Sequence, residues 1–80
     1  MHTTGKVIAF EVDTTRCETK HERLTGAEIK DIAKKPPANT LYLIESRDGH
    51  PFRREIGDTE IVHMHENQRF VTEPPIGKTS

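Results

Sequence analysis

The strongest constraint on the fold is one short helix whose start and end are both marked in the sequence. It begins in the segment at residues 24–29. The Thr25 hydroxyl can accept a hydrogen bond from the amide of Glu28, while the Glu28 carboxylate accepts one from the amide of Thr25. Leu24 is spaced to pack on Ile29 as a hydrophobic staple. The Pro-Pro pair at 36–37 ends the helix, because proline lacks an amide hydrogen and disfavours helical backbone before it.

This helix is predicted to be amphipathic. The apolar side chains fall on one face at helical spacing: Ile29, Ile32 and Ala33. The opposite face is polar and is expected to meet solvent: Lys30, Asp31 and Lys34. Lys34 and Lys35 also suit the negative end of the helix dipole. The helix is therefore expected to cover something apolar with one side only.

Two strands are expected before the helix. Residues 7–12 alternate between apolar side chains on one face and mixed ones on the other, which is typical of a strand buried mainly on one side. Asp13-Thr14-Thr15 supplies turn-forming residues. Residues 16–22 are polar and contain threonine, which suits a solvated second strand. The sequence therefore predicts a hairpin.

Three more segments of strand character follow the helix. Residues 41–45 form a compact apolar run and are predicted to be a central strand. An Asp-Gly turn then leads to a short antiparallel strand at 52–56. The segment at 60–64 is either a strand or a tight helical turn that places Ile61 and Met64 in the core. We favour the helical turn, followed by a final strand at 68–72.

The order of these elements predicts an α+β fold, in which a mixed four- to five-stranded sheet carries one helix packed on one face. This is a β-grasp layout, although ferredoxin-like halves and small split barrels share the pattern. We expect a frayed N-terminus at 1–5, a domain at 6–73 and a flexible C-terminal tail at 74–80, where two prolines and a glycine interrupt any regular pattern.

Composition excludes several classes of function. In 80 residues, 31% are apolar and 31% charged, so the core must be small. Lys and Arg number 12 against 13 Asp and Glu, which leaves no basic surface for nucleic acid. The apolar runs are far shorter than the ~20 residues that span a membrane, and no export signal precedes them. We expect a cytoplasmic protein, monomeric alone, that binds neither nucleic acid nor membrane.

The sequence offers little material for catalysis or for a cofactor. Cys17 is the one cysteine and lies in a polar run, so a half-buried strand residue is a better interpretation than a nucleophile. His63 and His65 would share a face if extended, but two histidines with Glu60 or Glu66 as a third donor fall short of a closed zinc site. We therefore predict that the protein is not an enzyme and holds no metal or cofactor.

Two motifs resemble the bacterial ubiquitin-like proteins of the multiubiquitin kind. They are the helix start Thr25-Gly26-Ala27-Glu28 and the closing segment Arg69-Phe70-Val71-Thr72-Glu73-Pro74-Pro75. The resemblance covers residues 6–75. The spacing from Met64 to Phe70 is also similar to that in ubiquitin, but the Gly-Gly end of ubiquitin is missing.

The resemblance implies that the chain is a protein modifier in a bacterial ubiquitination-like pathway. An activating enzyme would adenylate its C-terminal carboxylate, a conjugating enzyme would transfer it through an isopeptide bond, and a peptidase would process or deconjugate it. Antiviral defence is a role that such pathways imply. Gly77 is the glycine of the tail and is the predicted point of processing and conjugation, with Ser80 as the alternative.

Partner-binding residues are predicted on the open face of the sheet. If Leu41 and Leu43 face the helix, Tyr42 and Ile44 lie together on the other face as a docking patch, to which His63 and His65 would contribute. Five lysines are expected to be solvated and to be possible acceptors for chain formation: Lys6, Lys20, Lys30, Lys34 and Lys35. The alternative function is a non-conjugated adaptor domain, one unit of a multi-domain chain, that docks through this face.

Overall fold

Residues 6–75 are described by a computed structural model, and this part of the chain forms seven strands and one helix. In chain order they are β1 (Ile8–Val12), β2 (Thr15–Thr19), β3 (Arg23–Thr25), α1 (Gly26–Ile32), β4 (Thr40–Arg47), β5 (His50–Ile56), β6 (Ile61–His63) and β7 (Gln68–Glu73). The predicted strands on either side of the helix are thus present. The solvated strand predicted at 16–22 is wrong at its end, because β2 stops at Thr19 and a separate strand, β3, starts at Arg23.

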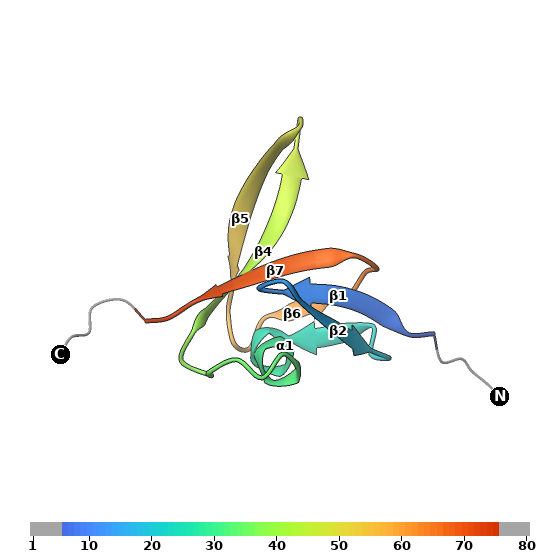
Figure 1. The fold of residues 1–80 in the computed structure, drawn as a ribbon, viewed down its shortest axis with the longest axis vertical. Coiled ribbons are helices and arrows are strands. Elements are labelled where there is room, and N and C mark those ends of the chain that lie inside the picture. The colour runs from blue at the N-terminus through green and yellow to red at the C-terminus, as the bar shows by residue number, and fades with distance from the viewer. Residues whose placement is uncertain (1–5, 76–80) are drawn as a thin grey trace.

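The main sheet has five strands in the order β2-β1-β7-β4-β5. β7 runs parallel to β1 and antiparallel to β4, so the sheet is mixed, as predicted. The last strand of the chain therefore lies in the middle of the sheet, between two hairpins (Figure 1). β3 and β6 form a second, two-stranded sheet.

Helix α1 begins and ends through short-range hydrogen bonds. At its start the Glu28 amide donates to the Thr25 hydroxyl at 3.2 Å and the Thr25 amide donates to the Glu28 carboxylate at 2.8 Å, which confirms the predicted capping box. At its end the Lys35 amide donates to the Lys30 carbonyl and the Lys34 amide donates to the Asp31 carbonyl. This pair of bonds is a Schellman motif, and it stops the helix before the two prolines.

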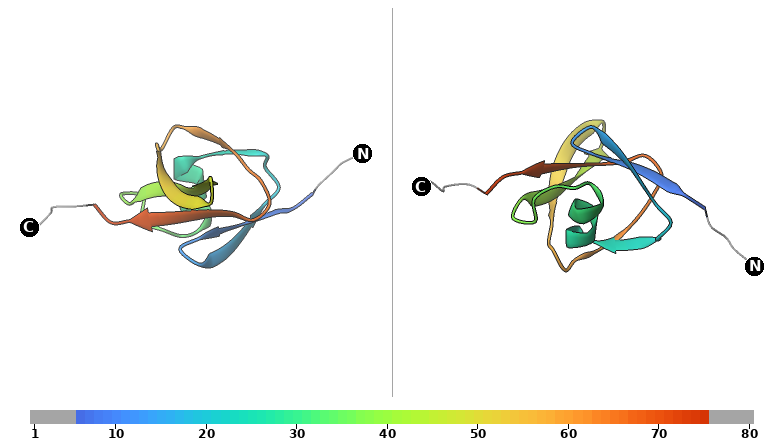
Figure 2. Two further views of the ribbon diagram at one scale, coloured as in Figure 1. Left: turned by 90° about the horizontal axis from the view of Figure 1, so that it is seen from above. Right: turned by 60° about the horizontal axis from the view of Figure 1, so that its bottom comes forward.

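Helix α1 packs on one face of the main sheet (Figure 2), and its buried Ile29 belongs to one core cluster with side chains of that sheet. Five side chains are almost completely removed from solvent: Phe10, Val12, Ile29, Leu41 and Phe70. The Phe10 and Phe70 rings, from neighbouring parallel strands, meet edge to face with centroids 6.0 Å apart. Leu24 belongs to the same cluster as Ile29, in agreement with the predicted staple.

The helical turn predicted at 60–64 is wrong, because residues 61–63 are strand β6. This strand pairs antiparallel with β3, and Val62 lies opposite Leu24. Val62 and Met64 are buried, whereas Ile61 is 61% exposed. The inward positions are thus two apart, as in a strand, and the three-residue spacing of Ile61 and Met64 was a misleading signal.

The β4–β5 hairpin extends beyond the rest of the sheet (Figure 1). β7 pairs with β4 only as far as Ile44, while β4 and β5 pair with each other up to the pair Arg47 and His50. In the extending part the Arg47 guanidinium lies 5.2 Å from the centre of the Phe52 ring. The outer half of this hairpin therefore has solvent on both faces.

Candidate functional site

The outer face of the main sheet, opposite α1, carries the predicted docking residues. On β4 the side chains of Leu41 and Leu43 are 0% and 6% exposed and point into the core. Tyr42 and Ile44 alternate with them, so they lie on the outer face, where both are half-buried. The structure thus places these two residues side by side on one face, as the alternation predicts.

The sheet register adds neighbours that the sequence alone did not identify. Val71 of β7 lies opposite Tyr42 and is also half-buried, and we call Tyr42, Ile44 and Val71 the outer patch. The Arg53 guanidinium lies 4.5 Å from the centre of the Tyr42 ring, in a cation–π contact. Arg69 and Arg53 lie opposite Ile44 on its two sides. The outer patch is therefore a small apolar strip between two arginines.

One of these arginines is held in place by the end of β7. Arg53 donates to the Glu73 carboxylate at 2.5 Å, and this hydrogen bond, together with the charge of Glu73, raises the pKa of Arg53. Beside the outer patch lies a shallow hollow of about 230 Å³ at the start of β1 and β7, whose charged lining residues are Glu11, Arg16 and Arg69. A partner on this face would thus meet apolar side chains bordered by charges of both signs.

His63 and His65 lie away from the outer patch. Both are exposed, and they line a separate hollow with Leu43 and Arg54, whose side chains point to the inner side of the β4–β5 hairpin. The structure therefore does not bring the two histidines together with Tyr42 and Ile44. Within residues 6–75 there is no group of three or more His, Cys, Asp or Glu side chains arranged to hold a metal ion.

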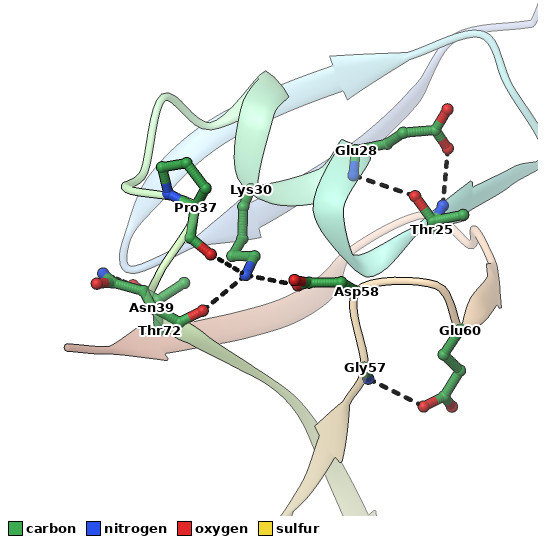
Figure 3. A network of polar contacts seen from close by, with 9 residues as sticks. All are labelled: Thr25, Glu28, Lys30, Pro37, Asn39, Gly57, Asp58, Glu60 and Thr72. Carbon is green, nitrogen blue, oxygen red and sulfur yellow. Dashed lines mark hydrogen bonds and ion pairs between the residues drawn. The ribbon is translucent and has the colours of Figure 1, made fainter. Parts of the chain in front are cut away.

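Lys30 is not solvated, which corrects the prediction that all five lysines are. Its residue exposure is 3%, and its ammonium group donates to the carbonyl oxygens of Pro37 and Asn39, each at 2.7 Å, and lies 2.7 Å from the Asp58 carboxylate (Figure 3). The buried charge is fully hydrogen-bonded, as burial requires. Lys30 is therefore unavailable as an acceptor in the folded state.

The other predicted acceptors differ in exposure. Lys6, Lys20 and Lys34 are exposed. Lys35 is partly buried, with its ammonium group 3.6 Å from the Asp13 carboxylate. Three of the five lysines thus have side chains that are open to solvent.

Cys17 is a structural residue of β2. It is 7% exposed and belongs to the core cluster, and its thiol lies 3.6 Å from the Thr15 carbonyl oxygen as a donor. Burial raises the pKa of this thiol, against a smaller opposite effect of the Lys35 charge. A thiol with a raised pKa has little thiolate at neutral pH and is a poor nucleophile.

The end of β7 is the last part of the chain that the structure describes in a regular element. Glu73 still pairs with Thr40 of β4, and it is followed by exposed Pro74 and Pro75, which have no amide hydrogen to donate to the sheet. Gly77 and Ser80, the predicted points of processing and conjugation, lie outside the described residues.

Comparison with known protein families finds a match to the multiubiquitin family over residues 8–74. The chain belongs to the multiubiquitin family. No curated protein and no solved structure matches it. The match spans every strand and the helix, and the five-stranded mixed sheet with one helix is the β-grasp of ubiquitin-like domains.

Membership limits what the outer patch of this multiubiquitin domain is expected to do. Ubiquitin-like domains are generally non-catalytic. In the part of the chain that the structure covers, no helix is long and apolar enough to cross a membrane. Sequence reasoning missed Val71 and Arg53 as neighbours of Tyr42, and only the register of β7 and β5 against β4 reveals them.

Proposed function

We propose that this multiubiquitin domain is a protein modifier in a bacterial ubiquitination-like pathway. In the first step the C-terminal carboxylate attacks the α-phosphate of ATP on an activating enzyme, forming an acyl adenylate and releasing pyrophosphate. A cysteine thiol then displaces AMP to give a thioester, and an amine of the target displaces the thiol to form an isopeptide bond. The chemistry belongs to the partner enzymes, and the domain supplies recognition and its own C-terminus.

The observation that carries this proposal is the position of β7 in a multiubiquitin family fold. β7 is central, and it is paired on one side with β1 and on the other with β4 as far as Glu73. The Pro74-Pro75 pair then ends the ladder, so the chain leaves the domain from the middle of the main sheet. A tag whose C-terminus must enter the cleft of another enzyme cannot have that end paired within its own sheet.

The exposed lysines support the formation of chains between copies. Lys6, Lys20 and Lys34 are open to solvent, whereas the Lys30 ammonium is enclosed by its three oxygen partners. Conjugation of one copy to another would therefore use the exposed lysines and leave Lys30 unmodified.

Activation can be tested directly with two forms of the chain. The full chain ending at Ser80 and a form ending at Gly77 are incubated with the activating enzyme of the same organism and ATP. We expect a covalent adduct that a thiol reductant releases, formed by the Gly77 form alone if processing is required and by both forms if it is not. Failure of both forms to give any reductant-sensitive adduct would overturn the proposal.

A second candidate function is a non-conjugated adaptor that docks through the outer patch. The observation that favours it is the half-buried Tyr42, Ile44 and Val71 on a face that the rest of the described chain leaves uncovered. Ile44→Ala should weaken partner binding while leaving the free energy of unfolding nearly unchanged. An adaptor would retain its partner binding in a chain whose C-terminal carboxylate is blocked, whereas a modifier would lose its function.

A further inference from the structure

The turn between β1 and β2 has a backbone that its second residue, Thr14, does not favour. Asp13 and Thr14 have φ values of 50° and 69°, and they form a two-residue turn, because Val12 pairs with Thr15. Such turns favour glycine at the second position, whereas a β-branched residue there crowds the backbone. The β4–β5 turn has the same left-handed geometry with the favoured pair Asp48 and Gly49. The first turn thus carries a strain that the second avoids.

The contacts made by Asp13 show what holds the strained turn in place. Its carboxylate accepts hydrogen bonds from both the amide and the hydroxyl of Thr72, the amide bond being 2.8 Å long. Its own amide donates to the Phe70 carbonyl at 3.0 Å, and Lys35 lies 3.6 Å from the carboxylate. These four contacts leave the β1–β2 hairpin, and three of them are made to β7. Asp13 therefore fastens the β1–β2 turn to β7, a strand from the other end of the described chain.

The end of β7 is also held by contacts on its other side. The Thr72 hydroxyl also accepts from the Asn39 side chain at 3.4 Å, and Asn39 is anchored through its carbonyl oxygen to buried Lys30. Glu73 is held by Arg53. Thr72 is thus held from both sides and Glu73 from the β4–β5 side, immediately before the Pro-Pro pair. The ends of strands are usually the least stable parts of a sheet, and this one is reinforced.

We propose that Asp13 is a positioning residue that fixes where the C-terminal segment leaves the domain, so that the activating enzyme receives it at a set place. This inference rests on the proposed function as a modifier. A frayed strand end has to be ordered when it binds, and this ordering opposes association. A strand end that is already fixed lowers the concentration of modifier needed for activation, without changing the chemical step.

The structural part of the proposal is tested by amide hydrogen exchange in Asp13→Gly. Glycine adopts a φ of 50° freely, so this variant removes the carboxylate without adding strain to the turn. We expect exchange at the Thr72 amide to be roughly tenfold faster, with residues 41–43 of β4 unchanged. Asp48→Gly is the matched control, because Asp48 has the same geometry in the other turn, and it should leave Thr72 unchanged. Thr72→Val replaces the hydroxyl by a methyl group and keeps the amide. It should speed exchange at the Glu73 amide less than Asp13→Gly does.

The functional part is tested by the rate of thioester formation as a function of modifier concentration. With Asp13→Gly we expect the half-saturating concentration to rise about three- to tenfold, because ordering the strand end now opposes binding, while the maximal rate stays the same. An unchanged half-saturating concentration, a uniform rise in exchange over the whole sheet, or an equal effect of Asp48→Gly would each overturn the inference. Failure of the unaltered chain to form a thioester overturns the proposed function instead, and the exchange results separate the two cases.

Discussion

The ammonium group of Lys30 lies 2.7 Å from the carboxylate of Asp58 and joins α1 to the loop after β5. The two side chains are unequal in their surroundings, since that of Lys30 is 4% exposed and that of Asp58 is 62% exposed. The contact is therefore a buried cation that reaches an open anion. Its two carbonyl partners, Pro37 and Asn39, belong to the loop after the helix, so one side chain connects three segments (Figure 3).

We expect Lys30→Met to destabilise the domain by about 3 kcal/mol, because the variant keeps the aliphatic stem but leaves the partly buried carbonyl groups of Pro37 and Asn39 without their donor. Asp58→Ala should cost about 1 kcal/mol or less, since the carboxylate is largely solvated. Urea unfolding of both variants measures the difference. Equal losses would show that the ion pair, and not the carbonyl contacts, sets the role of Lys30.

Burial of Lys30 also predicts a pattern of chemical reactivity. Brief treatment of the folded chain with an amine-acetylating reagent should modify Lys6, Lys20 and Lys34 well before Lys30, because their side chains are exposed and that of Lys30 is buried. Peptide mass spectrometry gives the extent at each site. The same treatment in denaturant is the control and should remove the difference. Early modification of Lys30 in the folded chain would contradict the placement described above.

Gly26 and Gly57 approach each other so closely that a side chain on the first has no room. A Cβ on Gly26 would lie 2.3 Å from the Gly57 carbonyl oxygen, whereas a Cβ on Gly57 would meet nothing closer than 3.9 Å. Gly26→Ala should therefore cost about 3 kcal/mol through a forced shift of the 57–60 loop, which also accepts the first helix amides. Gly57→Ala should be nearly neutral. Thermal unfolding of the pair decides, and similar melting temperatures would refute the close approach.

The C-terminal end of α1 offers a stabilising substitution. Lys34 occupies the left-handed position of the Schellman motif with a φ of 59°, where glycine is the favoured residue. Lys34→Gly should stabilise the domain by about 1 kcal/mol, because it removes the left-handed penalty of an L side chain. Lys34→Ala is the control and keeps that penalty, so it should not stabilise. If both variants behave alike, the gain comes from the lost charge and not from the backbone.

Asp13 predicts a pH dependence of stability. Burial alone would raise the pKa of its carboxyl, but the two hydrogen bonds from Thr72 and the charge of Lys35 outweigh burial and hold the pKa below 3.8. The unfolded chain then binds a proton at this carboxyl more readily than the folded one. The stabilisation is therefore present well above 3.8 and disappears as the pH falls through the lowered pKa of the folded state.

The stability difference between the unaltered chain and Asp13→Asn isolates this group from the other carboxyls. Measured by urea unfolding, it should be constant near neutral pH and shrink below about pH 4. A difference that stays constant down to pH 2 would show that Asp13 titrates alike in both states.

Local signals in the sequence predicted those elements whose contacts are also local. The capping box and the staple join residues at most five apart, from Leu24 to Ile29, so a short-range pattern was sufficient. The alternation in β4 likewise placed Tyr42 and Ile44 on the outer face. Strand β6 was considered but not favoured, because its partner, β3, is a three-residue strand that leads directly into the helix. Neither segment carries a clear pattern without the other.

No short-range sequence pattern predicted that the side chain of Lys30 would be buried. On the helix surface it belongs with the polar residues, and only the meeting of two distant loops encloses its ammonium group with oxygen atoms. The role of Asp13 was likewise not predictable, because in the sequence it is an ordinary turn-forming residue. Its partner Thr72 is 59 residues away, and no pattern within the turn indicates that the contact exists.

The central place of β7 has a consequence for the order in which the domain forms during synthesis. β1 and β4 both pair with β7 and not with each other, so the two hairpins have no common edge until residues 68–73 have left the ribosome. The contact between the Phe10 and Phe70 rings also cannot form until Phe70 has been synthesised. Each hairpin and the helix involve nearby residues and are expected to form early, whereas the sheet closes only when its last strand inserts between them. A nascent chain stopped before residue 68 would expose two unpaired strand edges, the surfaces on which aggregation begins.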